Sequence, residues 1–334
     1  MTKPAAVTIG DINGIGIEIL IDLFKKKIIN NFVLFSDVKE IKRYLNKRNH
    51  RIRINIINYN KKKNINLKKN CLNIFTFSSK SPEDNTLKSI IFAHQLCQEH
   101  KFAGMVTLPI RKDLIIKKQL PSFIGHTEFL QKLEKKKYSN MILLNKSIII
   151  TPLTTHLKLK KVVNKITKDN IYHQIKNLNK VLIRDLNIKF PKIILSGLNP
   201  HAGENGKIGN EEEKIINPSL TKLRKEKILV DGPVSADTML QKENIKKYDC
   251  FVFMYHDQAL IPFKLISKFN GVNFTGNLDV VRVSPDHGTA YQLKGNKNRS
   301  DKSIINCFKM VSKINKNRKS YEKSKKIIRS KFYN

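Results

Sequence analysis

Three histidines lie at the same kind of position, directly after an apolar run with the pattern of a β-strand. His156 follows residues 147–155, His201 follows 192–200, and His256 follows 250–255. In open α/β sheets, ligands bind outside the carboxyl ends of the strands, so residues that are distant in sequence can meet there. Imidazole is a common ligand of zinc and similar ions. The pattern therefore predicts one metal site, and the alternative is three unrelated loop histidines.

A second group of polar residues follows His256. Asp257 is adjacent to that histidine, and Lys264, Asn273 and Arg282 precede the glycine-containing run 284–290. A lysine and an arginine can hold a carboxylate or a phosphate, although either one alone can be a solvated surface charge. Arg282 is the stronger candidate, because the positive charge of this chain is mostly lysine.

The segment Gly125-His126-Thr127-Glu128-Phe129 places an imidazole, a hydroxyl and a carboxylate beside a glycine. It has the pattern of a helix N-terminus with Thr127 as the cap. A helix N-terminus also attracts anions, because its first N–H groups and its dipole face outward. The segment is therefore a candidate for binding an anionic ligand.

The glycine-rich turn 10–16 precedes a helical pattern and nearly matches the dinucleotide-binding fingerprint. Ile19 occupies the position of its third glycine. Asp37 follows the next strand, about where such folds place the acid that binds the ribose. A dinucleotide site and a tight turn lining another cleft both remain open at this point.

The composition limits the class of protein. The chain has 334 residues and is 40% hydrophobic, enough for two domains with cores. No apolar run approaches the roughly 18 residues that span a bilayer, and the first ten residues have the pattern of a strand and not of a signal peptide. The four cysteines are scattered without a C-x-x-C motif, as expected in the cytoplasm.

The net charge of +37 predicts attraction to polyanions. However, the lysines are spread along the whole length, together with many isoleucines and asparagines. We interpret this surplus as compositional drift of an A+T-rich coding sequence, with weak nonspecific polyanion binding as a by-product.

Strand and helix patterns alternate along the chain, which predicts an α/β fold with covered sheets. The expected strands cover 4–9, 32–36, 102–107, 141–150, 193–198 and 250–255. The expected helices cover 15–27, 85–99, 168–182, 211–225, 236–247 and 302–334.

Four motifs, in order along the chain, resemble the 4-hydroxythreonine-4-phosphate dehydrogenase (PdxA) family. They are Gly-His-Thr-Glu-Phe at 125–129, Gly-Leu-Asn-Pro-His-Ala-Gly-Glu at 197–204, Met-Tyr-His-Asp-Gln at 254–258 and Asp-His-Gly-Thr-Ala at 286–290. The resemblance extends from Gly10-Asp11 to about residue 300.

The resemblance implies an α/β fold of the isopropylmalate-dehydrogenase type, with two domains and an active-site cleft between them. The first domain is expected to contain residues 1–130 and about 301–334. The second, residues 131–300, is expected to carry the metal ligands and to form a homodimer with shared active sites.

The family's functional residues fall on matching positions of this chain. One divalent ion (Zn, Mg or Co) is implied at His156, His201 and His256. Substrate binding is implied for His126, Thr127, Asp237, Lys264, Asn273 and Arg282. The loop His287-Gly288-Thr289-Ala290 resembles the adenosine-binding loop of related decarboxylating dehydrogenases, which argues against a dinucleotide site at the glycine turn. Lys264, or Asp257 with a water, is a candidate general base.

The family oxidises 4-phosphooxy-L-threonine at C3 with NAD or NADP, and the product loses carbon dioxide to give 3-amino-2-oxopropyl phosphate in pyridoxal 5'-phosphate biosynthesis. A sister enzyme acting on a phosphorylated threonate or erythronate, or on a dihydrodiol, is the alternative. A more distant alternative is a polyanion-binding protein on a degenerate enzyme scaffold. We expect a cytoplasmic enzyme with no specific nucleic-acid or membrane partner.

The chain departs from the family pattern in its loops. Ile12 and Ile17 stand where prolines are usual, and Leu108 replaces a glycine. The stretch 293–298, which includes Lys297, replaces a glycine–lysine–glycine turn. We expect altered loop geometry in an active enzyme, because the metal and substrate positions are intact.

Overall fold

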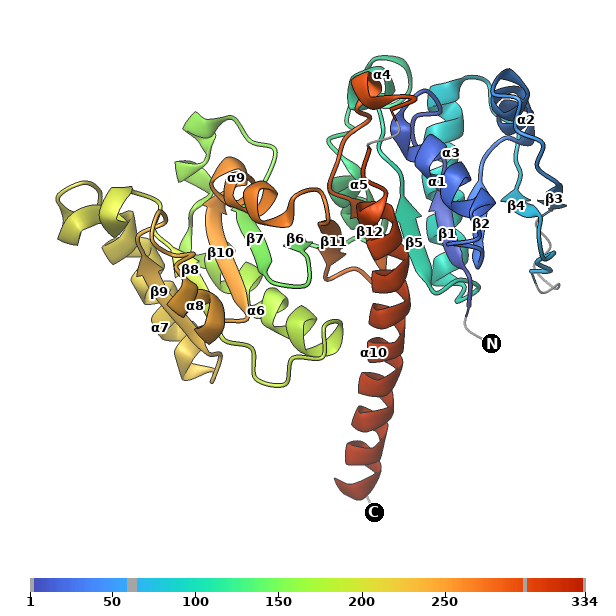
Figure 1. Cartoon of the computed structure of the whole chain (residues 1–334). Helices are drawn as coiled ribbons and strands as arrows, with labels where there is room; N and C mark the ends of the chain where they lie inside the picture. Colours follow the sequence, from blue (N-terminus) through green and yellow to red (C-terminus); the bar gives the residue numbers. More distant parts are fainter. Residues whose placement is uncertain (1–2, 59–64, 297–298, 333–334) are drawn as a thin grey trace. The chain divides into compact units, whose positions relative to one another are not determined.

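The computed structural model describes residues 3–58, 65–296 and 299–332, and it divides the chain into two compact units (Figure 1). Unit 1 consists of residues 1–134 and 278–315, and unit 2 of residues 135–277 and 316–334. The chain passes from unit 2 back to unit 1 after residue 277. This is earlier than the domain boundary expected near 300, because the strand over residues 282–285 pairs within unit 1. Lys297 and Asn298, in the unusual turn, lie outside the described residues.

Unit 1 is built on a parallel sheet with the strand order β3-β4-β2-β1-β5-β12. Its strands are β1 (Ala5–Thr8), β2 (Phe32–Phe35), β3 (Ile54–Ile57), β4 (Leu72–Phe75), β5 (Gly104–Thr107) and β12 (Arg282–Pro285). Its helices are α1 (Ile15–Lys25), α2 (Val38–Lys47), α3 (Pro82–Gln98), α4 (Lys112–Lys118), α5 (His126–Leu133) and the start of α10 (Lys302–Phe332). Every residue of β1, β2, β4, β5 and β12 is buried, as continuous apolar runs in a covered parallel sheet predict, whereas the edge strand β3 is only partly buried.

Helix α3 closes one side of the unit 1 core. Its N-cap is Ser81, whose hydroxyl accepts a hydrogen bond from the Asp84 N–H at 3.1 Å, and Pro82 occupies the first turn. Ile90 and Ala93 of α3 pack on Phe35 and Phe75 of the sheet, whose rings are stacked with centroids 4.8 Å apart.

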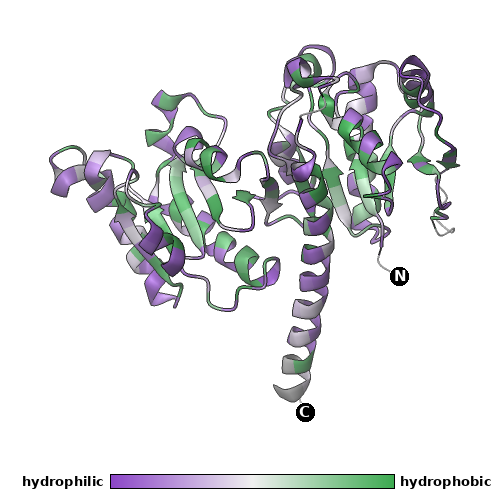
Figure 2. Cartoon of the chain, viewed as in Figure 1, coloured by the Kyte–Doolittle hydropathy of each residue, from purple (hydrophilic) through white to green (hydrophobic). Residues whose placement is uncertain are grey.

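Unit 2 has a mixed sheet with the order β11-β6-β7-β10-β8-β9. Its strands are β6 (Asn140–Leu144), β7 (Ile149–Thr154), β8 (Ile193–Ser196), β9 (Val230–Val234), β10 (Cys250–Tyr255) and β11 (Val272–Gly276). Its helices are α6 (Lys168–Arg184), α7 (Asn217–Lys225), α8 (Lys242–Lys247) and α9 (His256–Ser267). The four strands β7, β10, β8 and β9 are parallel neighbours, whereas β6 pairs antiparallel with both β7 and β11. Figure 2 shows apolar strands and more polar helix surfaces.

A buried ion-pair cluster joins the end of α10 to unit 2. Asp185, which is fully buried after α6, accepts hydrogen bonds from Arg184 at 2.6 Å and from Arg318 at 2.8 Å. Burial alone would raise the pKa of Asp185, but the two arginines outweigh it and lower that pKa. The last part of α10 therefore belongs to unit 2, whereas the whole helix was expected in the first domain.

Most expected strands and helices correspond to elements of the structure. The single strand expected over 141–150 is wrong, because the chain turns at residues 145–148 and β6 and β7 pair antiparallel on either side of the turn. The helix expected over 236–247 is wrong in its first half, because residues 236–240 form turns and only α8 is helical. Helices α2, α4 and α9 and strands β4, β9, β11 and β12 were not expected. Within the described residues, no helix is long and apolar enough to cross a membrane.

Candidate functional site

Four adjacent strands of unit 2 end at one edge of the sheet, and each is followed by a predicted site residue. His156 follows β7, His256 follows β10, His201 follows β8 and Asp237 follows β9. Parallel pairing forces this arrangement, because the carboxyl ends of parallel neighbours meet at the same edge. The edge predicted to collect these side chains therefore exists.

The rings of His156 and His256 lie close together, with centroids 5.7 Å apart and planes tilted by 41°. The Nδ1 of His256 is 2.6 Å from a carboxylate oxygen of Asp257. When a histidine binds a metal, its other ring nitrogen commonly donates to such a carboxylate, which orients the ring. Asp257 is therefore placed to support His256 and leaves the Nε2 of that ring for a ligand.

His201 lies in the turn Pro200–Gly206, in which residues 201–205 all have positive φ. The buried carboxylate of Glu212 holds the start of this segment, because it accepts the N–H groups of Leu198 at 2.8 Å and Asn199 at 2.9 Å. At Gly203, with φ +83°, a Cβ would stand 2.6 Å from the Glu212 carboxylate, so only glycine fits. Glu212 thus fixes the conformation of this loop.

The donor set fits a divalent ion in its chemistry but is incomplete within one chain. Two imidazoles lie close together, and one of them has a carboxylate on one of its ring nitrogens. Yet no group of three or more His, Cys, Asp or Glu side chains in the described part of the chain could hold one ion. His201 instead lies near Asp237, whose pKa is lowered first by the Ser235 hydroxyl and also, more weakly, by His201.

Lys264 and Asn273 are the other predicted substrate residues of unit 2. Lys264 is on α9, two turns after His256, and Asn273 is on β11 opposite Leu143. The Oδ1 atom of Asn273 is buried and has no hydrogen-bond partner within the described residues. An unsatisfied buried acceptor is costly, so this position suits a ligand that supplies a donor.

In unit 1, the guanidinium of Arg282 is the centre of a second polar cluster. Arg282 begins β12 and is only 3% exposed. Its Nε and Nη2 donate to the Thr107 hydroxyl at 2.9 and 2.7 Å, and Nη1 lies 3.5 Å from the Thr127 hydroxyl. Burial lowers the pKa of Arg282 to about 10, which leaves it charged near neutral pH. Arg282, which the sequence favoured over the many lysines, is therefore a buried cation.

His126 and Thr127 form the first turn of α5 beside this guanidinium. The expected cap is wrong, because Gly125 is the N-cap and Thr127 lies inside the helix. Burial, then the charges of Arg282 and Lys112, hold the pKa of His126 well below its usual value. The Nε2 of this 9%-exposed side chain has no hydrogen-bond partner in the described ranges. A neutral imidazole with an unused nitrogen therefore faces an excess of positive charge, which favours an anionic ligand.

Lys112 is a member of the cluster that the sequence analysis missed. It opens α4 and is half-buried, and its pKa is lowered by burial and by Arg282, against the opposing influence of Glu128. Among the many lysines of this chain, nothing in the local sequence separates Lys112 from its neighbour Lys117. Its place shortly after β5, at the carboxyl end of a strand, was the available signal.

The predicted cofactor loop packs against the glycine turn. The Thr289 carbonyl accepts the Ile15 N–H at 3.0 Å, and a Cβ on Gly14 would stand 3.2 Å from the same oxygen. Gly10, with φ +63°, has Leu108 and Pro109 against it, so that a Cβ there would stand 2.5 Å from the Pro109 carbonyl. The glycines therefore allow close packing, and a carbonyl occupies the helix end that a phosphate would need.

Asp37 does not have the ribose-reading role considered from the sequence. It is the N-cap of α2 and accepts the Lys39 N–H at 2.9 Å. Its second oxygen accepts hydrogen bonds from the N–H and the hydroxyl of Ser79, both at 3.0 Å. Both carboxylate oxygens of Asp37 are therefore engaged in hydrogen bonds inside the protein.

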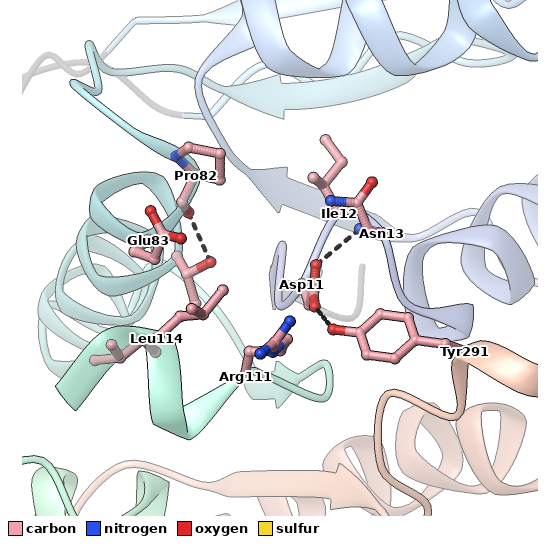
Figure 3. A pocket seen from close by; sticks show the side chains of 10 residues that line it. Asp11, Ile12, Asn13, Pro82, Glu83, Arg111, Leu114 and Tyr291 are labelled. Atoms are coloured by element: carbon pink, nitrogen blue, oxygen red, sulfur yellow. Dashed lines mark hydrogen bonds between the residues drawn. The ribbon is translucent and has the colours of Figure 1, made fainter. Parts of the chain in front are cut away.

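A cavity of about 160 Å³ adjoins the loop 286–290 (Figure 3). Asp11 accepts a hydrogen bond from Tyr291, and the Arg111 guanidinium lies 6.0 Å from the ring of that tyrosine. Leu114 and Ile12 contribute apolar walls. Glu83, on the first turn of α3, is paired with Lys118 through one oxygen, and its other oxygen is buried without a partner among the described residues.

The chain is similar to known proteins of one family. A family model described as "Pyridoxal phosphate biosynthetic protein PdxA" matches residues 27–311. The 4-hydroxythreonine-4-phosphate dehydrogenase of Sulfurihydrogenibium sp. is 34% identical over 94% of this chain and 99% of its own length. The crystal structure of the Klebsiella pneumoniae enzyme of the same name is 28% identical, with a TM-score of 0.80 over 94% of this chain and 98% of that one.

The fold class is confirmed by the same comparisons. The chain also resembles, in fold alone, a β-decarboxylating dehydrogenase from Thermococcus kodakarensis, with a TM-score of 0.50 and 11% identity over 93% of this chain and 82% of that one. The likeness to these two solved structures supports an α/β fold of the isopropylmalate-dehydrogenase type.

The depressed pKa of His126 makes stability depend on pH. Below its ordinary pKa of about 6.5, the unfolded chain binds a proton at this histidine before the folded chain does, so stability falls as the pH falls. Between pH 7.5 and 5.5 we expect wild type to lose about 1 kcal/mol more than His126→Gln, measured by urea unfolding at both pH values. His100→Gln, at an exposed site, is the control. Equal losses in wild type and His126→Gln would contradict the assigned burial.

Proposed function

The chain belongs to the PdxA family of pyridoxal phosphate biosynthetic proteins, and from this premise we propose the specific reaction. It oxidises 4-phosphooxy-L-threonine at C3 with NAD or NADP and a divalent metal, and the resulting β-keto acid loses carbon dioxide to give 3-amino-2-oxopropyl phosphate. The observation that carries the proposal is the edge of unit 2, where three histidines and Asp237 follow four neighbouring parallel strands.

We propose that the unit 1 cluster holds the phosphate of the substrate. Arg282 supplies a fixed charge, and Thr127 and the N–H groups of the first turn of α5 supply donors. The neutral imidazole of His126 donates one N–H, and Lys112 adds a second cation close by. We propose that Lys264 and Asn273 of unit 2 bind the substrate as well, and that Asp237, which follows β9 beside the histidines, does so too.

His156, His201 and His256 would hold the divalent ion, which when bound supplies Lewis-acid assistance to ionisation of the C3 hydroxyl. The hydroxyl proton passes to a base, for which Lys264, or Asp257 with a water, is positioned by α9. A bound nicotinamide would supply the acceptor for the hydride of C3, and that chemistry belongs to the cofactor. Asp257 keeps the His256 ring in one orientation throughout.

For the cofactor, we propose that the loop 287–290 and the adjoining cavity bind the adenosine part. The cavity has apolar walls and one unsatisfied carboxylate oxygen on Glu83. A ribose hydroxyl or an amino group would satisfy that oxygen.

We propose a homodimer in which the metal site is completed by the second copy. The three histidines do not form a metal-binding group within one chain. Helix α9, which begins with His256, exposes Ile261 (63%), Leu265 (72%) and, just beyond its end, Phe269 (60%). Ile261 and Leu265 are four residues apart and share one face of α9. An exposed apolar patch of this kind favours burial against another protein surface.

The metal requirement has a direct assay. Purified protein is expected to reduce NAD or NADP with 4-phosphooxy-L-threonine, to lose activity after chelation, and to recover when Zn, Mg or Co is added. His256→Ala and His201→Ala should each lower kcat by at least about 100-fold and reduce the bound metal measured by elemental analysis, whereas His50→Gln should not.

Full activity of His201→Ala after chelation would contradict the metal site. A panel containing phosphorylated threonate, phosphorylated erythronate and a dihydrodiol separates the sister-enzyme alternative. If one of those compounds is turned over in preference, the proposed substrate is wrong, whereas the proposed metal site is unaffected.

Lys112→Met tests the phosphate cluster. Loss of one charged hydrogen bond costs about 1.5 to 3 kcal/mol, so KM for the phosphorylated substrate should rise about 10- to 100-fold with a small change in kcat. Lys112→Arg should restore most of the affinity, and Lys117→Met on the same helix should leave KM unchanged. A fall in kcat with unchanged KM in Lys112→Met would contradict a phosphate-binding role.

The proposed dimer face can be tested by charge. Leu265→Asp combined with Ile261→Asp should convert the dimer to a monomer in analytical ultracentrifugation and abolish metal binding, because a carboxylate cannot be buried unpaired. Phe190→Asp, at another highly exposed apolar residue of unit 2, should remain a dimer. A monomeric wild type, or a dimer that survives the double substitution, would exclude this face.

A further inference from the structure

Unit 1 contains a groove whose charged side chains, among the described residues, are all basic. Its volume is about 770 Å³, and the described part of its lining includes six cations and no carboxylate. The cations are Lys25, Lys27, Arg51, Arg53, Lys68 and Lys69. All six are exposed, and within the described residues none of them forms an ion pair with an acid.

The acids closest in sequence are already paired elsewhere. Glu18 and Asp22 lie on α1, the helix that ends with Lys25, but Arg299 binds both of them, and Arg48 also pairs with Glu18. They therefore do not neutralise the groove. Mutual repulsion among the six cations is left for a ligand or for salt to relieve.

The backbone that carries these cations is ordered by specific hydrogen bonds. The side chain of Asn73, which is 4% exposed, accepts the Lys68 N–H at 2.9 Å and donates to the Lys68 and Cys71 carbonyls. The Arg53 carbonyl accepts the Leu72 N–H at 2.8 Å, which fixes the chain before β3 against β4. Preorganised cations lose less entropy when they bind an anion than cations on free loops.

The groove lies at the opposite end of the unit 1 sheet from the Arg282 cluster. Its cations precede β3 and β4, end α1 or lie between α1 and β2, which places them at the amino ends of these parallel strands. Thr107 and Arg282, by contrast, sit toward the carboxyl end of β5 and on its neighbour β12. A four-residue strand is about 13 Å long, so a ligand in the groove would not occupy the substrate cluster.

We propose that this groove is a second ligand site that binds a small molecule carrying two or more phosphate groups, of the nucleoside polyphosphate class. Six cations without a carboxylate require a ligand of higher charge than the single phosphate of the substrate. The remaining lining suits an organic part, because Phe24, Ile52 and Leu67 are apolar and Asn30 and Asn70 offer amide groups. The volume lies in the range of sites for such ligands, about 300 to 1,000 Å³.

A nucleic acid is a less suitable occupant. Grooves for single strands combine cations with several aromatic side chains on which successive bases stack. Here Phe24 is the single aromatic residue of the described lining, and its ring already packs edge-on against Phe32 at 6.0 Å. Charge without a stacking platform favours the compact polyphosphate.

As a test, the binding of inorganic tripolyphosphate to the whole protein is measured by titration calorimetry at low and physiological salt. Affinity should fall steeply with salt. The double variant Lys68→Gln with Arg53→Gln should bind at least about tenfold more weakly, since two charged contacts are lost. The matched control, Lys242→Gln with Lys246→Gln on α8, removes the same charge from unit 2 and should change the affinity less than about twofold.

Equal weakening in both double variants would show that net charge alone binds the anion and would overturn the proposal. Binding of a single-stranded RNA that tripolyphosphate cannot displace would also overturn the proposal. Single-phosphate substrate should compete poorly, and ATP should compete well. Because binding is measured without turnover, failure here leaves the proposed dehydrogenase activity untouched, and failure of the enzyme assay leaves this site open.

Discussion

Parallel pairing of neighbouring strands is the constraint on which both sets of functional residues depend. In unit 2 the ladder of β7, β10, β8 and β9 brings four chain segments, separated by up to 100 residues, to one edge. In unit 1 the pairing of β5 with β12 places Arg282 where it can donate to Thr107. The same rule gathers the amino ends of β2, β4 and β3, so one sheet presents an anion-binding cluster at one end and a basic groove at the other.

The two anion sites of unit 1 differ in how they treat charge. Near Arg282, burial makes every positive charge costly, so the pKa values of Arg282 and Lys112 fall and His126 stays neutral. Such a site binds a few specific groups strongly, because the ligand recovers a desolvation cost already present in the protein. The basic groove is exposed, so its cations are fully solvated and its attraction depends on their number and on ionic strength.

The sequence predicted what depends on apolar runs and on family motifs. The strands that end before His156, His201 and His256 were found because a buried parallel strand is a continuous apolar stretch. Local signals failed where tertiary contacts decide: Thr127 looked like a cap but Gly125 has that position, and Asp37 looked like a ribose ligand but caps α2. Lys112 could not be separated from other lysines, because only burial beside Arg282 distinguishes it.

The surplus of lysine illustrates the same limit. A net charge of +37 spread along the chain suggests drift without function, and no linear cluster in the sequence contradicts that. The fold nevertheless brings together three separated segments, around 25–27, 51–53 and 68–69, because each precedes or follows an element of one sheet. Whether a charge is scattered or clustered is therefore a property of the topology. Drift in composition can supply the lysines, but only the strand order determines which of them face a common volume.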